Sequence, residues 1–155
     1  MKKTYHKTAG LITILALFIV ATSNCSNTDK NKNTSAIPEA KIEGKIEGQS
    51  VRFRISIPER HHAYLDRGKE GRLIPISFDW KNALETTDTP DIASTPSGSF
   101  DQDYGATVLR GEGEFVFQLK KASELIGKIV KVKTQICDDV KGICYRPIIE
   151  EVVIN

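Results

Sequence analysis

Apolar residues recur at every second position along much of this chain, and that spacing constrains its fold more than any other feature. The clearest run places its apolar side chains at Val51, Phe53, Ile55 and Ile57. Similar alternation occupies residues 114–119 and 128–136, and further apolar runs occupy 73–80 and 148–154. Because successive side chains of a strand point to opposite faces of a sheet, this spacing predicts β-strands.

Glycines and prolines separate these runs and predict turns between them. The short near-repeat over residues 41–48 predicts a first strand with a turn, and only residues 122–126 indicate a helical turn. About seven short strands in roughly 110 residues predict an all-β, immunoglobulin-like antiparallel β-sandwich over residues 41–155. A barrel with the same number of strands is the structural alternative.

The amino-terminal segment has the composition of an export signal. Three lysines precede an apolar run over residues 11–21, and Asp29 is the first acidic residue. An apolar run of about 11 residues suits a secretory signal peptide, since a membrane-spanning helix needs about 20. A retained membrane anchor is the alternative.

The residues that follow the apolar run refine this prediction. The sequence Ala-Thr-Ser-Asn-Cys over 21–25 resembles the lipobox of bacterial lipoproteins, which implies a signal peptide over residues 1–24 and lipidation at Cys25. Residues 26–35 are all polar, so residues 25–40 are expected to form a flexible tether. The protein is then exported and lipid-anchored to a bacterial membrane, facing the periplasm or the cell surface. Ordinary cleavage nearby, with a spare thiol at Cys25, is the alternative.

Length and charge exclude several classes of function. A chain of 155 residues has room for one globular domain, which excludes a large multi-domain enzyme. The 22 basic residues exceed the 20 acidic ones by only two and are scattered, so a nucleic-acid partner is not expected. Once the three lysines of residues 1–24 are subtracted, 19 basic residues face 20 acidic ones, a net charge of −1.

Sites for other chemistry are not indicated. His61 and His62 stand near Asp66 and Glu70, but adjacent strand residues point to opposite faces and do not easily share a metal, so no metal site is predicted. The sequence has no Ser/His/Asp pattern, phosphate-binding glycine loop or HExxH motif. We therefore expect neither a hydrolase nor a bound cofactor.

Cys137 and Cys144 are the two cysteines that remain when Cys25 is assigned to lipid. An even number of cysteines in an oxidising compartment predicts a disulfide. On spacing alone a structural staple is favoured, and the chain-entropy model values such a loop at roughly 2.5 kcal/mol. A short loop also strains a disulfide more readily, and strained or exposed disulfides are the ones that tend to be redox-labile.

The residues around this pair favour redox chemistry. Residues 135–147 read QICDDVKGICYRP and resemble the redox motif in the amino-terminal domain of the thiol:disulfide interchange protein DsbD. In that family two cysteines bracket a short acidic hairpin that contains glycine, the second cysteine is followed by Tyr and then Pro, and the domain is an immunoglobulin-like sandwich. Residues 61–64 (HHAY) resemble the family's aromatic strand beside the disulfide, and residues 100–105 (FDQDYG) resemble its cap loop.

The resemblance implies a set of site residues. Cys144 would carry the mixed disulfide with a partner, and Cys137 would resolve it. The implied surroundings of the disulfide are His62, Tyr64, Phe100, Asp101, Gln102, Asp103, Tyr104, Gly105, Tyr145 and Pro147. We expect Cys137 and Cys144 at the mouth of a β-hairpin with Cα atoms within about 7 Å, and Phe100 or Tyr104 in contact with the pair.

The chain also departs from the family. Six residues separate the cysteines, one more than in the best-known members, and Asp103 stands where an aromatic residue normally shields the disulfide. DsbD continues into a membrane-spanning domain and a thioredoxin-like domain, whereas this sequence ends at Asn155. The electron donor is therefore expected to be a separate protein.

The function implied by the resemblance is thiol–disulfide exchange, as in a protein-disulfide reductase or interchange component. A thioredoxin-like or membrane electron-transfer protein would be the donor, and exported proteins with disulfides would be the acceptors. Asp138 and Asp139 would disfavour a thiolate at Cys137, and Lys141 and Arg146 would favour it. The alternative is a non-catalytic immunoglobulin-like surface lipoprotein with a structural disulfide.

Overall fold

The structure is a computed structural model that describes residues 37–84 and 90–155. The predicted signal peptide, the lipidation site at Cys25 and most of the predicted tether lie outside the described residues. Ala40, at the end of the predicted tether, is 5% exposed and packs in the main core.

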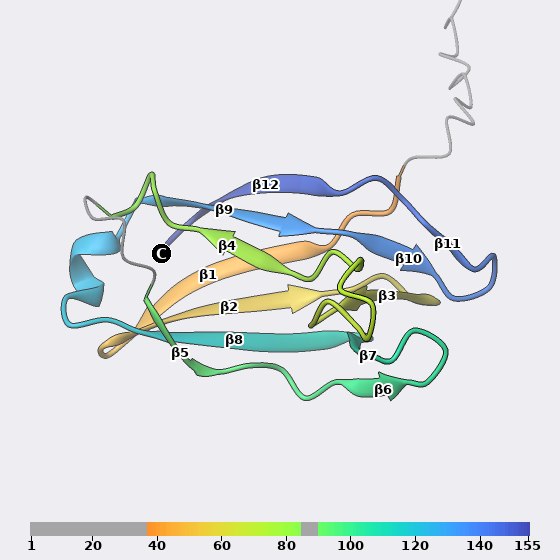
Figure 1. The fold of residues 1–155 in the computed structure, drawn as a ribbon. Helices are drawn as coiled ribbons and strands as arrows, with labels where there is room; N and C mark the ends of the chain where they lie inside the picture. The colour runs from red at the N-terminus through yellow and green to blue at the C-terminus, as the bar shows by residue number, and fades with distance from the viewer. Residues whose placement is uncertain (1–36, 85–89) are drawn as a thin grey trace, which may run out of the picture. The chain divides into compact units, whose positions relative to one another are not determined.

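The described residues form an all-β, immunoglobulin-like antiparallel sandwich, as the alternation predicts (Figure 1). The first layer consists of β1 (Lys41–Glu47), β2 (Ser50–Ser56), β8 (Glu112–Gln118) and β5 (Asp91–Ser94) in the order β1-β2-β8-β5. The facing layer consists of β12 (Ile148–Val153), β9 (Ile129–Thr134) and β4 (Ser77–Asp79) in the order β12-β9-β4. A parallel bridge between Gly44 and Ile154 joins the two layers along one edge.

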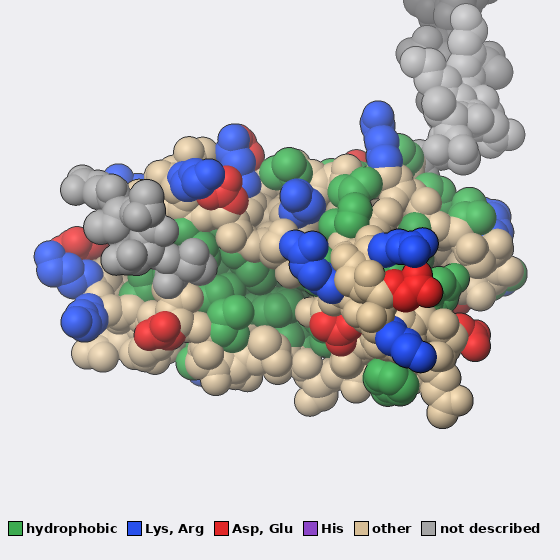
Figure 2. All heavy atoms as spheres, viewed as in Figure 1, with side chains coloured by type: hydrophobic (Ala, Val, Ile, Leu, Met, Phe, Trp, Pro, Cys, Tyr) green, Lys and Arg blue, Asp and Glu red, His purple; other side chains and the backbone are tan. Residues whose placement is uncertain are grey.

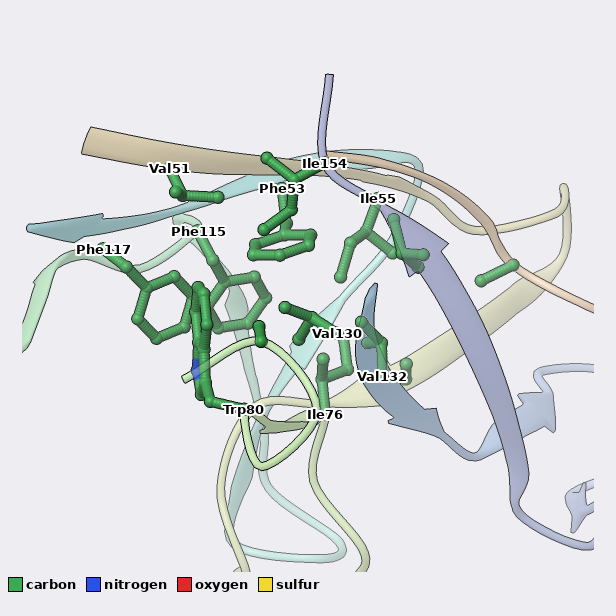
Figure 3. Close-up of a cluster of buried hydrophobic side chains, with 14 of the residues drawn as sticks. Val51, Phe53, Ile55, Ile76, Trp80, Phe115, Phe117, Val130, Val132 and Ile154 are labelled. Atoms are coloured by element: carbon green, nitrogen blue, oxygen red, sulfur yellow. The ribbon is translucent and has the colours of Figure 1, made fainter. Parts of the chain in front are cut away.

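The main core lies between these layers and is rich in aromatic residues (Figure 3). Phe53 and Phe117 project from the first layer and are 0% and 1% exposed, because they occupy the inward positions of the alternating strands. Phe78 packs between them, with ring centroids 4.9 Å from Phe53 and 4.8 Å from Phe117. Trp80 closes the cluster at 5.0 Å from Phe117. Edge-to-face and tilted packing of this kind adds to the gain from burial alone.

A third sheet, of five strands, lies at one end of the sandwich. Its strands are β11 (Ile143–Cys144), β10 (Ile136–Asp138), β3 (His61–Tyr64), β7 (Ala106–Leu109) and β6 (Ser99–Asp101), in the order β11-β10-β3-β7-β6. Only Gln135 separates β9 from β10, so one alternating run supplies strands to two sheets. The labels of β10, β11, β3, β7 and β6 gather at the right of Figure 1.

The structure differs from the sequence-based expectation in detail. The run over residues 73–80 yields strand only at Ser77–Asp79, because Pro75 lacks the N–H that a ladder needs and forms just an isolated bridge with Tyr64. A 3-10 turn at Ala122–Leu125 agrees with the predicted helical turn. Twelve strands are present in the described residues, more than the predicted seven, because β4, β5, β6 and β11 are two to four residues long.

The surface of the described residues has mixed charge. On the face in Figure 2, Lys and Arg side chains lie among Asp and Glu side chains, in keeping with the scattered charges of the sequence. Within residues 37–84 and 90–155, no helix has the length and apolar character that would carry it across a membrane. The same residues contain no cluster of three His, Cys, Asp or Glu side chains able to hold a metal ion.

Candidate functional site

Cys137 and Cys144 form a disulfide across the β10–β11 hairpin. They are directly opposed in the antiparallel register, and their Cα atoms are 3.9 Å apart, within the predicted limit. The Tyr145 N–H donates to the Ile136 carbonyl at 2.9 Å, which makes the cysteines a non-hydrogen-bonded pair with closely spaced side chains. The local sequence folds this way because Gly142, with a φ of 63°, lets the chain turn back.

The two sulfur-bearing residues differ in exposure. Cys137 is 2% exposed and belongs to a small buried cluster with Tyr64, Ala106 and Val108, which is separate from the main core. Cys144 lies on the edge strand and is exposed. An external thiolate can therefore approach the disulfide from the Cys144 side.

Asp138 stabilises the β10–β11 turn, next to the disulfide. Its carboxylate accepts the backbone N–H groups of Val140 and Lys141, both at 2.9 Å, and lies 3.0 Å from Lys141 Nζ. The Tyr145 hydroxyl donates to the same carboxylate at 3.4 Å. The hydrogen bonds from the Lys141 backbone and side chain lower the pKa of Asp138 well below its usual range.

A polar network lies on the other side of the hairpin. Asp139 Oδ1 is 2.7 Å from His62 Nδ1 and accepts a hydrogen bond from Arg110 Nη2 at 2.9 Å, while Asp139 Oδ2 accepts one from Arg110 Nε at 3.2 Å. The bonds from Arg110 and His62 lower the pKa of Asp139 against the opposing effect of its partial burial. Since an ionised carboxylate only accepts hydrogen bonds, His62 Nδ1 carries a proton and donates a hydrogen bond to Asp139 Oδ1.

His62 joins this network to the disulfide. It is 5% exposed and directly opposite Cys137 in the pairing of β3 with β10, so both side chains leave the same face of the sheet. Its ring packs edge-on against Tyr64 with centroids 5.0 Å apart. Its Nε2 is buried and has no hydrogen-bond partner among the described residues.

Tyr64 occupies the centre of the small cluster and is 1% exposed. Its hydroxyl has no partner within the part of the chain that the structure describes. Burial, with smaller contributions from Tyr104 and Asp101, raises the pKa of Tyr64 to about 12, so the hydroxyl keeps its proton. Tyr104 packs on Tyr64 with ring centroids 5.8 Å apart and reaches the site through it.

The predicted cap loop lies in the same five-stranded sheet as the disulfide, at the β6–β7 turn. The Asp101 carboxylate accepts the N–H groups of Asp103 and Tyr104 at 3.1 and 3.4 Å, and Gly105 completes the turn with a φ of 59°. Gln102 and Asp103 are exposed. Asp101 also faces Arg110, with Oδ2 3.9 Å from Nη2.

Phe100, one of the two aromatic residues expected in contact with the disulfide, lies away from it. It is 67% exposed and lies on β6, which β7 and β3 separate from β10. The reason is strand order and register. Phe100 lies on β6, the edge strand farthest from β11, where it pairs with Thr107 of β7. Of the two aromatic residues expected near the disulfide, Tyr104 is the one that contacts the cluster around Cys137.

The remaining predicted residues lie at the periphery. Tyr145 is half-buried beside Asp138, and Pro147 is exposed beyond β11. No local sequence pattern indicates Arg110, which directly follows β7 and donates hydrogen bonds to Asp139. A lone arginine before a glycine has no motif, so only the folded arrangement of β3, β7 and the hairpin brings it to the site.

Comparisons with known proteins find similar chains only among solved structures. No family model matches the chain, and no curated protein matches it. The chain is similar to DsbD amino-terminal domains. The reduced amino-terminal domain of DsbD from Neisseria meningitidis has a TM-score of 0.48 and 23% identity, over 75% of this chain and 84% of that one. A chain from the structure of the complex between the DsbD and PilB amino-terminal domains of the same organism has a TM-score of 0.43 and 19% identity, over 72% of this chain and 79% of that one.

Proposed function

We propose that this protein is an exported, lipid-anchored relay for thiol–disulfide exchange. Its Cys137–Cys144 disulfide accepts electrons from a thioredoxin-like or membrane electron-transfer protein and passes them to exported proteins that contain disulfides. The observation that carries the proposal is the asymmetry of the pair, since Cys144 is exposed and Cys137 is 2% exposed. Exchange needs one accessible sulfur for the partner and one protected sulfur to resolve the intermediate.

The reaction follows from this asymmetry. A donor thiolate attacks the Cys144 sulfur, the bond to Cys137 breaks, and Cys137 leaves as a thiolate. The second thiolate of the donor then attacks the donor sulfur that is bonded to Cys144. This step forms the disulfide of the oxidised donor and releases Cys144 as a thiolate. In the second half, Cys144 attacks a substrate disulfide and Cys137 attacks Cys144, so the substrate leaves as a dithiol and the Cys137–Cys144 bond forms again.

The hairpin supports this use because it does not depend on the disulfide for closure. Backbone bonds join Tyr145 to Ile136 and Gly142 to Asp138, both at 2.9 Å, and the Asp138 carboxylate holds the turn. The disulfide closes a loop with a sequence separation of only 7, where the constraint on the unfolded chain is small. Both redox states can therefore keep the same fold.

The charges around the pair support exchange in the same way. Asp138 and Asp139 are each matched by a cation, Lys141 at 3.0 Å and Arg110 at 2.9 Å. The two carboxylates consequently oppose a thiolate at Cys137 less than their positions in the sequence suggest. The lipid anchor at Cys25 is proposed from the sequence and would keep the domain at a membrane surface.

A redox titration tests the proposal. The full-length protein carrying Cys25→Ser, in detergent, has Cys137 and Cys144 as its only thiols. Equilibrated with glutathione buffers, its disulfide should have a potential above roughly −300 mV, the value below which structural disulfides typically lie. The reduced protein should exchange with an oxidised thioredoxin, and the oxidised protein with a reduced one.

The matched control is the same protein with Cys137→Ser/Cys144→Ser. It should remain folded and exchange with neither form of thioredoxin. A potential far below −300 mV, or unfolding on reduction, contradicts the relay and favours the surface lipoprotein with a structural disulfide. The anchor is tested separately by incorporation of labelled fatty acid, which Cys25→Ser should abolish.

A further inference from the structure

His62 is a buried titratable residue that the exchange steps above leave without a role. Its side chain is 7% exposed, its Nδ1 is held by Asp139 at 2.7 Å, and its Nε2 has no hydrogen-bond partner among the described residues. A buried polar atom without a partner costs free energy, so it needs an explanation.

We propose that His62 is the acid–base residue of the exchange reaction and takes the proton of the Cys137 thiol at Nε2 as Cys137 resolves the mixed disulfide. The inference rests on the proposed function, since it assigns a proton path to that reaction. In the reverse direction His62 returns the proton to the Cys137 thiolate that the donor has released.

The position of His62 supports this role. It is directly opposite Cys137 in the antiparallel register, on the face of the sheet that carries the disulfide. Its ring packs against Tyr64 at 5.0 Å, and Tyr64 shares a buried cluster with Cys137. The imidazole and the buried sulfur therefore lie on paired strands and on the same face of the sheet, and β10 separates His62 on β3 from the exposed Cys144 on β11.

The hydrogen bonds of His62 fix the state that the reaction needs. Arg110 donates twice to Asp139 and keeps that carboxylate ionised, and Asp139 in turn accepts from Nδ1. A neutral imidazole that donates from Nδ1 presents a lone pair at Nε2. The lone pair finds no proton on a disulfide, but the thiol of reduced Cys137 supplies one, which accounts for an Nε2 without a partner in the oxidised protein.

The resolving step moves one proton and one electron pair. Cys137 S–H gives its proton to His62 Nε2, and its electron pair attacks the Cys144 sulfur. The bond from Cys144 to the partner sulfur breaks, and the partner leaves as a thiolate. The imidazolium that forms is stabilised by Asp139 and then loses its proton to the departing thiolate or to solvent.

The charged and titratable groups that face His62 come from every neighbouring element. Asp139 follows β10, Arg110 follows β7 and is itself near Asp101 of β6, and Tyr64 lies on β3. Arg110 and Asp139 compensate each other, and the Tyr64 hydroxyl stays neutral because burial raises its pKa to about 12. The imidazole Nε2 is therefore the atom of this set that is left to accept a proton.

Resolution of a glutathione mixed disulfide tests the inference. The reduced full-length protein carrying Cys25→Ser, in detergent, is mixed with oxidised glutathione and quenched in acid, and mass spectrometry follows the glutathionylated intermediate. Formation of the intermediate reports attack by Cys144, and its decay to the internal disulfide reports attack by Cys137. With His62→Gln, decay at pH 7 should slow at least about tenfold while formation changes less than about twofold.

His61→Gln is the matched control. His61 is the same residue type one position away, points to the opposite face, and has its Nδ1 2.7 Å from the Glu59 carbonyl oxygen. Its decay rate should stay within about twofold of the reference.

Two further measurements guard against a variant that does not fold. Asp139→Asn retains the imidazole but replaces the ionised carboxylate with a neutral amide that can donate as well as accept, so the tautomer with Nδ1–H is no longer fixed. This variant should also slow decay at least about tenfold. In the reference protein, ¹⁵N NMR of the imidazole should show the Nε2 resonance of His62 moving on reduction, whereas that of His61 stays in place.

The outcomes separate the two proposals. Normal formation and decay in the reference, with an unchanged decay rate in folded His62→Gln or in Asp139→Asn, overturn the role of His62 and leave the relay intact. An Nε2 resonance that does not respond to reduction overturns it as well. A reference protein that forms no mixed disulfide overturns both.

Discussion

Asp138 holds Lys141 at two points across the β10–β11 turn, because its Oδ1 accepts the Lys141 backbone N–H at 2.9 Å and its Oδ2 lies 3.0 Å from Lys141 Nζ. The turn that carries the disulfide is thereby closed by hydrogen bonds that a change of redox state does not touch.

Asp138→Ala should loosen this turn in the reduced protein. The variant loses the charged acceptor of the Val140 and Lys141 N–H groups, so hydrogen exchange at these two amides should become at least about tenfold faster. Hydrogen exchange in β2 and β8 should not change, since those strands belong to a different sheet from β10 and β11. Equal exchange at Lys141 in the variant and the parent, both reduced, would contradict the role given to Asp138.

The pH dependence of the same turn has a definite sign. The folded-state pKa values of Asp138 and Asp139 are both lowered, by Lys141 and by Arg110. A lowered pKa contributes stability above the unfolded value of about 3.9 and loses it as the carboxylate is protonated in the folded state. The melting temperature should therefore fall progressively below about pH 5. Asp138→Asn should weaken this fall, and a decline that begins near pH 7 would need a different group.

The alternating runs predict the strands that build the sandwich, because burial between two layers requires that pattern. Val51, Phe53 and Ile55 each have 0% exposure, as period-two spacing demands. The short strands β5, β6 and β11 are not predicted from periodicity, since two to four residues are too few to establish a period. Their places depend on partners that are distant in the sequence.

The candidate site also has a part that the sequence predicts and a part that it does not. Local motifs predict Cys137, Cys144 and Tyr64 as site residues, and the structure brings them together. The contact of Arg110 with Asp139 joins residues 29 positions apart, so no local pattern contains it. The exposure of Phe100 also follows from pairing, because its outward direction is set by its register with Thr107.

Tyr64→Phe should leave the oxidised protein as stable as the parent, or more stable by up to about 1 kcal/mol. The change removes a buried hydroxyl that has no partner among the described residues and keeps the ring that packs on His62 and Tyr104. Urea unfolding of both proteins measures the difference. Tyr145→Phe is the comparison, since that hydroxyl donates to Asp138 at 3.4 Å, and it should not gain stability. A large loss in Tyr64→Phe would mean that the hydroxyl has a partner.

Variants that keep only one of the two cysteines should react with external disulfides at unequal rates, because Cys144 is exposed and Cys137 is buried. In the Cys25→Ser background, Cys137→Ser leaves the exposed Cys144 and should trap a stable mixed disulfide with a thioredoxin-like protein. Cys144→Ser leaves Cys137, which is 2% exposed in the cluster with Tyr64 and Val108, and should react with an aromatic disulfide reagent at least about tenfold more slowly. Denaturation in urea should bring the two rates together, which distinguishes burial from intrinsic reactivity. If Cys137 reacts as fast as Cys144 in the folded variants, the partner has access to both sulfurs and the division into attacking and resolving thiols is wrong.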